Sequence, residues 1–290
     1  MLEQSSERVF ASILGAHQIS ARVTDNITYC GKWIEREPQV PRGIFHLISA
    51  GSCRVEGHDL PQPINLASGD LIVFPRGSAH TLCHELRADG GTPADTGMLC
   101  GEFTCADRNP VLDALPDCFV VREQEGEGHF RALGQVLAAE AQRPLFGNQA
   151  VMNKLADSLL SLAIRCHVAS AFPGHGLLAA LRDPRLSRAL AAMHDDPGRD
   201  WSVAELAQTA NLSRTAFCER FAETLGLAPM QYLTEWRMTE ALRLLRDPAQ
   251  SVARIAERLG YQTEAAFRRA FKRVHGYGPG KVRQDAAGAD

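Results

Sequence analysis

The stretch "GYQTEAAFRRAFKRVHGYGP", residues 260–279, decides how the C-terminal part of this chain folds. Its periodicity places Phe267, Phe271 and Val274 on one side of a helix and puts basic residues around the rest. A glycine and then a proline follow, which is typical of a helix end, because glycine adopts the left-handed conformation that closes a helix. We therefore expect an amphipathic helix with a buried aromatic side and an exposed basic side.

A second copy of this pattern lies earlier in the chain, as "NLSRTAFCERFAETLGLAP", residues 211–229. Before each quoted stretch a serine, Ser202 or Ser251, precedes a first short helix. Its side chain can cap that helix by accepting hydrogen bonds from free N–H groups. A tight turn is expected at Asn211 in one copy and at Gly260 in the other, and a second helix follows. The pattern predicts two helix-turn-helix units. They span residues 202–224 and 251–274.

Between the two units, "MQYLTEWRMTEALRLL", residues 230–245, reads as one uninterrupted amphipathic helix. Sixteen residues at 1.5 Å each span roughly 24 Å. Such a spacer can hold two recognition helices about one DNA turn apart, roughly 34 Å, on the same face of a duplex.

The charge of the chain is unevenly distributed, although its net value is only −3. Residues 199–284 carry 14 Lys and Arg against 9 Asp and Glu, whereas residues 1–198 carry 17 against 23. A basic C-terminal third on an acidic body predicts a module that binds a polyanion.

The outward side of each predicted recognition helix supplies the candidate DNA contacts. Arginine can fork onto guanine O6 and N7, whereas lysine mostly neutralises phosphate, so Arg268 and Arg269 are the strongest base-reading candidates. Glu219 cannot help with phosphate but can accept from cytosine N4. We interpret Arg220, Arg254, Arg258 and Arg273 as solvated or phosphate-contacting residues. The full candidate set is Arg214, Thr215, Cys218, Glu219, Glu264, Arg268, Arg269 and Lys272.

Residues 183–284 resemble the DNA-binding domain of the AraC/XylS family of bacterial transcription regulators, most specifically over "GYQTEAAFRRAFKRVHGYGPGKVR". The resemblance implies double-stranded DNA as a partner, RNA polymerase as a second partner and homodimerisation. We expect an activator, with repression left open. The position of Glu219 is often basic in similar family members, which leaves the sequence preference of the first unit open.

The N-terminal part reads as short strands over residues 20–122, separated by turns, which predicts a β-sandwich or β-barrel. "GDLIVFPRGSAH", residues 69–80, fits G-x5-P-x-G-x2-H and resembles the second signature motif of cupin barrels. The first cupin motif is degraded and keeps a single histidine, His46. We expect an α+β two-domain protein with a cupin-like β-barrel. The predicted boundaries are 1–126 for the sensor domain, 127–176 for a helical linker and 177–290 for the DNA-binding domain.

Cys30, His46, His80 and Cys100 all fall on predicted strands of this small barrel. If all four point inward, they form a Cys2His2 set suited to a soft or borderline metal such as Zn(II) or Cu(I). A cysteine pair beside histidines also suggests a redox switch. Lone histidines and cysteines are, however, more often satisfied core residues, so this alternative stays open.

Residues 128–169 have the periodicity of two helices, the second with Val151, Leu155, Leu159, Leu162 and Cys166 near one face. We expect these helices to make a homodimer contact, with packing inside the subunit as the alternative. Residues 169–176 read as a linker.

The N-terminus lacks a basic leader, and no apolar run reaches the roughly 18 residues of a membrane span, which predicts a cytoplasmic protein without a membrane partner. We interpret the chain as a transcription regulator, not an enzyme, whose barrel senses a small effector, a metal or an oxidant. The rival hypotheses are a cupin metalloenzyme with a helical appendage and a nucleoid protein without sequence preference.

Overall fold

The chain divides into two compact units, which are described separately. One unit is Gln18–Phe172, and the other combines Met1–His17 with Pro173–Asp290. The computed structural model describes residues 2–16, 19–57, 60, 62–84, 94–105, 112, 114–142, 146–170 and 176–287.

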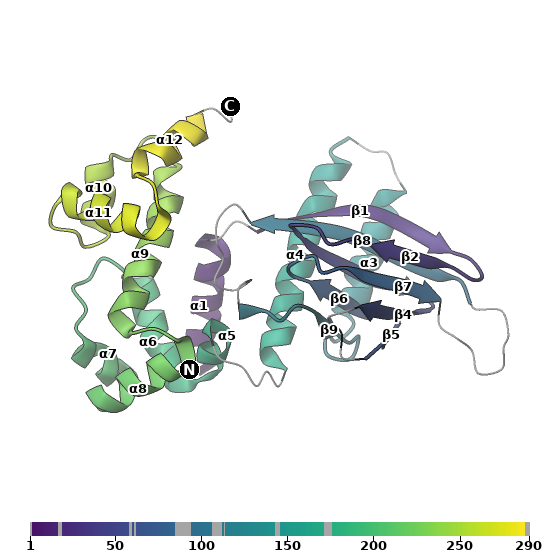
Figure 1. Ribbon diagram of the computed structural model, residues 1–290, viewed down its shortest axis with the longest axis horizontal. Helices are drawn as coiled ribbons and strands as arrows, with labels where there is room; N and C mark the ends of the chain where they lie inside the picture. The colour runs from purple at the N-terminus through teal and green to yellow at the C-terminus, as the bar shows by residue number, and fades with distance from the viewer. Residues whose placement is uncertain are drawn as a thin grey trace. The chain divides into compact units, whose positions relative to one another are not determined.

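The first unit contains two antiparallel sheets (Figure 1). One sheet has the strand order β1-β8-β3-β6-β9, and the other has the order β2-β7-β4-β5. Hydrogen bonds do not close these two sheets into one barrel within the described residues, so the predicted barrel is not confirmed. The strands are β1 Ile19–Tyr29, β2 Ile34–Glu37, β3 Gly43–Ala50, β4 Ser52–Gly57, β5 Ile64–Ala67, β6 Leu71–Phe74, β7 His80–His84, β8 Thr96–Cys105 and β9 Phe119–Val121.

The strand β6 explains how the apolar "LIVF" run of the cupin-like motif is used, because all four of its residues are buried. Ile72 and Phe74 belong to the core cluster that also contains Val55 and Leu82 of the smaller sheet. Leu71 and Val73 alternate with them and face the opposite side of the five-stranded sheet. A strand covered on both faces reads as a continuous hydrophobic run rather than an alternating one.

Helices α3 (His129–Ala141) and α4 (Asn148–Ala169) pack on the five-stranded sheet, in contact with β1, β3 and β9 (Figure 1). This packing inside the subunit leaves the predicted homodimer contact open, because it concerns only one side of each helix. The buried face of α4 is also rotated from the predicted one, since Val151 is 49% exposed. The residues that α4 buries are Met152, Ala156, Leu159, Leu160, Ala163 and Ile164.

The second unit is helical, and its sequence-predicted plan is confirmed. Both predicted helix-turn-helix units form, and the predicted spacer is the single helix α9 between them (Figure 1). Its helices are α1 Leu2–Ala16, α5 Leu177–Arg182, α6 Pro184–Asp195, α7 Val203–Thr209, α8 Arg214–Leu225, α9 Pro229–Leu245, α10 Val252–Arg258, α11 Glu264–His275 and α12 Pro279–Ala287.

The N-terminal helix α1 lies against α5, α6 and α9 of this helical unit. The sequence interpretation assigned residues 1–126 to the sensor domain and did not separate this helix from it. The residues of α1 that are buried recur at helical spacing, and they are Ser5, Val9, Phe10, Ile13 and Ala16.

Candidate DNA interface and sensor site

The first recognition helix, α8, follows α7 after a turn in which Asn211 has a φ of 53°. The Ser213 side chain caps α8 by accepting a hydrogen bond from the Ala216 N–H at 3.3 Å. Phe217 and Phe221 are fully buried, as predicted, and their rings meet edge to face. The helix is therefore anchored by its aromatic side, which leaves the opposite side exposed.

The second recognition helix, α11, repeats this arrangement. Thr263 caps it, and Phe267 and Phe271 are fully buried in the core cluster of this unit. Val274, expected on the same side, is 39% exposed, so the buried stripe ends one turn earlier than the periodicity indicated. Gly276 closes the helix with a φ of 79°, in the left-handed conformation that the sequence predicts.

All eight candidate DNA-contacting residues lie on α8 or α11. Six of them are exposed, whereas Cys218 and Glu264 are half-buried. Arg268 forms an ion pair with Glu264 one turn earlier, with 2.6 Å between Nη2 and Oε1. Arg269 has no ion-pair or hydrogen-bond partner among the described residues. Arg269 can therefore turn its guanidinium to a base edge without giving up an existing contact.

The four basic residues that the sequence assigned to a solvated or phosphate-contacting role fall into two groups in the structure. Arg254, Arg258 and Arg273 are exposed. Arg220, in contrast, forms an ion pair with Asp183, the residue that caps α6. Arg220 therefore joins α8 to the start of α6.

Two groups that the sequence interpretation missed join the two helix-turn-helix units. Arg237 of α9 donates from Nε to the Pro197 carbonyl at 2.6 Å and from Nη2 to the Arg199 carbonyl at 2.9 Å. The same loop approaches the second turn so closely that a Cβ on Gly198 would clash with the Arg258 carbonyl, and one on Gly260 with the Gly198 carbonyl. These contacts fix the loop before α7 to both α9 and the second unit. A glycine pair distant in sequence gives no pattern that reveals such an approach.

In the sheet unit, three of the four candidate sensor residues are connected in one buried series of side-chain contacts. His46 Nδ1 is 3.1 Å from Cys100 Sγ, and His46 Nε2 is 2.9 Å from His80 Nε2. His80 Nδ1 is 2.7 Å from the Ser78 carbonyl oxygen. Strand pairing brings these groups together, since His46 of β3 is opposite Cys100 of β8.

The positions of the protons in this chain follow from one carbonyl. Burial lowers the pKa of His46 to about 3 and also lowers the pKa of His80, so both rings are neutral near pH 7. The Ser78 oxygen only accepts, so His80 carries its proton on Nδ1 and accepts at Nε2 from the His46 Nε2–H. His46 Nδ1 is then the acceptor for the Cys100 S–H. The histidines hold a neutral thiol whose sulfur keeps its lone pairs.

Cys30 does not take part in this series of hydrogen bonds. It follows the end of β1 and is exposed, and a hydrogen bond to Asp95 raises the pKa of its thiol. The described residues contain no group of three or more His, Cys, Asp or Glu side chains placed to hold a metal ion. The predicted Cys2His2 set is therefore not assembled in this structure, because Cys30 lies apart and His46 lies between Cys100 and His80.

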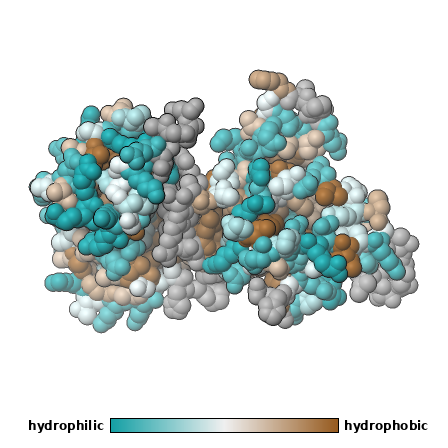
Figure 2. Space-filling model, turned by 45° about the horizontal axis from the view of Figure 1, so that its top comes forward, coloured by the Kyte–Doolittle hydropathy of each residue, from teal (hydrophilic) through white to brown (hydrophobic). Residues whose placement is uncertain are grey.

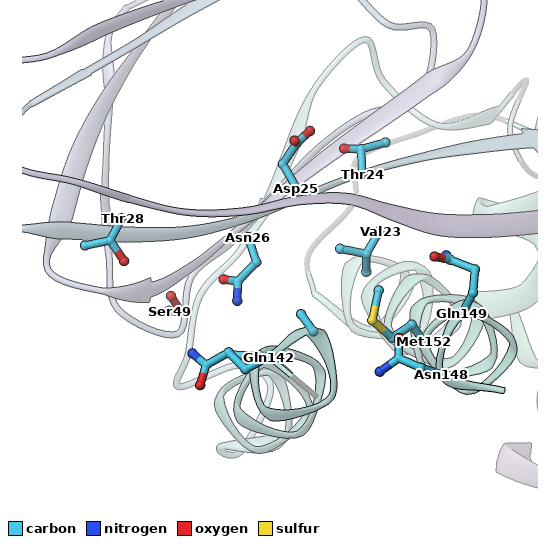
Figure 3. Close-up of a pocket in the computed structure, with 12 residues that line it drawn as sticks. Val23, Thr24, Asp25, Asn26, Thr28, Ser49, Gln142, Asn148, Gln149 and Met152 are labelled. Atoms are coloured by element: carbon cyan, nitrogen blue, oxygen red, sulfur yellow. The ribbon is translucent and has the colours of Figure 1, made fainter. Parts of the chain in front are cut away.

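A polar pocket of about 570 Å³ lies on the helix-covered side of the five-stranded sheet (Figure 3). Figure 3 shows Asn26 and Thr28 on the side of β1 that faces the helices, with Gln142 opposite, whereas Asp25 points away from the helices. The register of β1 shifts between Val23 and Asp25. Bulges of this kind often re-aim side chains beside functional sites. The pocket presents amides and hydroxyls suited to hydrogen-bonding a small uncharged molecule.

The helical unit has the layout of a double helix-turn-helix DNA-binding domain, and the sheet unit that of a cupin-like domain. Residues 8–169 match the family model described as Cupin, and residues 206–285 match the model described as Helix-turn-helix domain. The chain belongs to the AraC-like transcription regulators.

A putative AraC-like transcription regulator of Streptomyces antibioticus is 35% identical to it, over 88% of this chain and 91% of the relative. The HTH-type transcriptional regulator MtrA of Neisseria gonorrhoeae is 27% identical, over 88% and 91%. The solved DNA-binding domain of AdpA, in complex with a target DNA, is 32% identical over 35% of this chain and 91% of that one, with a TM-score of 0.33.

The chain is therefore a DNA-binding transcription regulator of the AraC family. Among the residues with a described structure, no helix combines the length and the apolar character needed to cross a bilayer.

Proposed function

We propose that this regulator binds DNA with sequence specificity by placing α8 and α11 in successive major-groove segments of one duplex. The observation that carries the proposal is that Arg269 points outward, without a partner among the described residues, on a helix whose two phenylalanines are fully buried. The spacer supports it, because the 17 residues of α9 at 1.5 Å each give about 25 Å between the units.

The test begins with selection of a duplex from a random pool by the full-length protein. Arg269→Ala should then weaken binding to the selected duplex by about 1–3 kcal/mol if a bidentate base contact is lost, and weaken binding to a scrambled duplex less. Arg273→Ala on the same helix is the matched control and should affect both duplexes alike. Equal losses for Arg269→Ala on both duplexes would assign Arg269 to phosphate. If no duplex is enriched, the protein binds DNA without sequence preference, as the rival hypothesis of a nucleoid protein states.

We further propose that the sensor domain responds to a soft metal ion such as Cu(I), bound between Cys100 and His46. Burial raises the pKa of the Cys100 thiol well above its usual range, which makes it a poor nucleophile towards oxidants. Thiolate and imidazole are ligands that Cu(I) accepts, and a metal ion deprotonates a thiol that it binds. The two donors fit a two-ligand ion better than tetrahedral Zn(II), which takes four ligands.

Titration of the purified protein with Cu(I) against a chromophoric competitor tests the metal proposal. We expect one Cu(I) per chain, loss of binding in Cys100→Ser and retention in Cys83→Ser. Two results together would show that the signal is an oxidant. The purified protein would bind no Cu(I), and a single equivalent of hypochlorite would oxidise Cys100.

Homodimerisation through α3 and α4 is a further part of the proposed function, as is recruitment of RNA polymerase. Val136 and Val151 on these helices are each about half exposed. On the face shown in Figure 2 hydrophobic residues form separate spots in a mainly hydrophilic surface. Sedimentation of the wild type against Val136→Glu with Val151→Glu tests the dimer. If the wild type and the double variant both sediment as dimers, the contact lies elsewhere. If both sediment as monomers, the protein does not dimerise under these conditions.

A further inference from the structure

The N-terminal helix α1 occupies a face of the DNA-binding unit that the helix-turn-helix motifs do not themselves cover. Val9 and Ile13 are fully buried there, and Ala16 is 5% exposed. This face is formed by α5, α6 and α9. The core of the DNA-binding unit therefore includes a helix from the opposite end of the chain.

Specific polar contacts fix the position of α1. The Ser6 hydroxyl donates to the Leu181 carbonyl at the end of α5, at 2.6 Å. Arg8 pairs with Asp195 at the end of α6, with 2.7 Å between Nη1 and Oδ2. Because these two polar contacts reach different helices, they favour one register of α1 on that face, which a purely apolar contact would not impose.

A hydrogen-bonded chain continues from α1 through α6 to α9. Ser12 Oγ is 2.6 Å from His194 Nδ1, and His194 Nε2 is 2.7 Å from Tyr232 Oη. The His194 ring also stacks on Trp236 with 3.7 Å between ring centroids. His194 is 8% exposed, so its bond to Tyr232 is buried, and the bond to Ser12 is partly buried. Hydrogen bonds in such surroundings depend strongly on geometry. Docking of α1 thereby braces α6 against α9, the helix that spaces the two recognition helices.

The other end of α1 leads directly into the sensor sheet. Only residues 17 and 18 separate Ala16 from Ile19, where β1 begins. The Cα atoms of Ala16 and Ile19 are three peptide steps apart and can be separated by about 11 Å at most, so the connection between α1 and β1 is short. The strand β1 also lines the polar pocket and is held by α4, since the Ala21 N–H donates to Asp157 Oδ1 at 2.7 Å.

We propose that α1 is the coupling element of this regulator, and that its partner surface is the α5–α6–α9 face of the DNA-binding unit. Docked α1 braces α6 against α9, the helix that spaces α8 and α11, so the docked state is the DNA-competent one. Signal binding acts through the difference in free energy between docked and undocked α1. This inference rests on the proposed function for the identity of its output.

Full-length Ile13→Asp tests the proposal, with Ala11→Asp on the exposed side of α1 as its matched control. Ile13→Asp should lose hydrogen-exchange protection in α1 and bind the selected duplex about tenfold more weakly, within the range typical of coupling between sites. The slope of log K against log salt should stay that of the wild type, because α1 supplies no phosphate contact. Wild-type affinity together with an undocked α1 would overturn the proposal.

A charge reversal provides a variant that does not disturb the core. Arg8→Glu should weaken α1 protection and DNA affinity, and Arg8→Glu with Asp195→Arg should restore both. Absence of rescue would mean that the contact is incidental. If no duplex is selected by the wild type, the proposed function fails, whereas docking of α1 is still measured by hydrogen exchange.

A third variant separates docking from coupling. Insertion of Gly-Ser-Gly-Ser between residues 17 and 18 should leave α1 protected and abolish any change in DNA affinity that Cu(I) causes in the wild type. A full Cu(I) response in the insertion variant would exclude α1 as the connection.

Discussion

The two helix-turn-helix units of this protein share their framework and differ in the helix that each presents to DNA. Both bury two phenylalanines four residues apart, and both cap the recognition helix with a hydroxyl side chain. Yet α8 carries two arginines and two glutamates, whereas α11 carries four basic residues and one glutamate. The comparison teaches that the inner face fixes the fold and leaves the outer face free to diverge. We therefore expect the second unit to be the stronger electrostatic anchor on DNA.

The largest expected effect tests whether the two inner faces are equivalent. Phe221→Ala and Phe271→Ala should each lower the free energy of unfolding by about 3–5 kcal/mol, because each deletes a fully buried ring and leaves a cavity. Urea denaturation of the full chain measures this. Val274→Ala is the control and should cost far less, since Val274 is partly exposed. A small loss in one unit alone would show that its core is not built as the other is.

The turn residues should respond unequally, although both adopt positive φ. Gly260→Asn should destabilise the protein by roughly 1–3 kcal/mol, because its Cβ would clash with the Gly198 carbonyl. Asn211→Gly should change stability by about 1 kcal/mol or less, since glycine accepts the φ of 53° without strain. Thermal unfolding compares the two. Equal effects would mean that the contact between Gly198 and Gly260 is not tight.

The outer faces should differ in the salt dependence of DNA binding. Lys272→Ala in α11 should lower the magnitude of the slope of log K against log salt by about 0.9, the value for one lost phosphate contact. Glu219→Lys in α8 should raise it by about the same amount. Titrations of the selected duplex at several salt concentrations measure both. A slope unaffected by Lys272→Ala would show that α11 does not touch the backbone at that residue.

The smallest effect concerns the first helix of each unit. Hydrogen bonds from the Ser202 backbone and side chain, then Arg199, lower the pKa of Glu205 to about 2. The stability that Glu205 contributes should be present above its unfolded pKa of about 4.5 and be lost as the pH falls through 2. In the second unit Arg254 takes the equivalent place after Ser251. The free energy of unfolding is measured as a function of pH for the wild type, Glu205→Gln and Arg254→Gln. Glu205→Gln should lose the pH dependence between 4.5 and 2 that the wild type shows, whereas Arg254→Gln should keep it.

Much of the helical unit was predictable because its signals are local. Caps, left-handed turn residues and a phenylalanine spacing of four are read within one helix, and each of them is confirmed. The contacts between units were not predictable in this way. Arg237 and Gly198 act on carbonyls tens of residues away, and nothing in their own neighbourhood marks them.

The sensor unit was predictable only in part. The cupin-like motif located His80 and the buried strand before it. That His46 and Cys100 fall on predicted strands left open whether they meet, and the structure places His46 Nδ1 3.1 Å from Cys100 Sγ. Cys30 was placed on a strand and lies beyond the end of β1, because one residue decides whether a side chain follows the alternation of a strand. The rotated face of α4 has the same origin, since periodicity identifies an apolar stripe but not the partner that covers it.

The amino-acid sequence by itself determined the two repeated helical units, their basic outer faces and the cupin-like character of the strands, because these depend on neighbours within a few residues. The tertiary structure alone decided that His46 connects Cys100 with His80, that α3 and α4 cover a sheet, and that α1 completes the DNA-binding unit. These features depend on which surfaces meet after the chain has closed long loops. Several apolar faces of similar size could have met there, and only the packed fold selects among them.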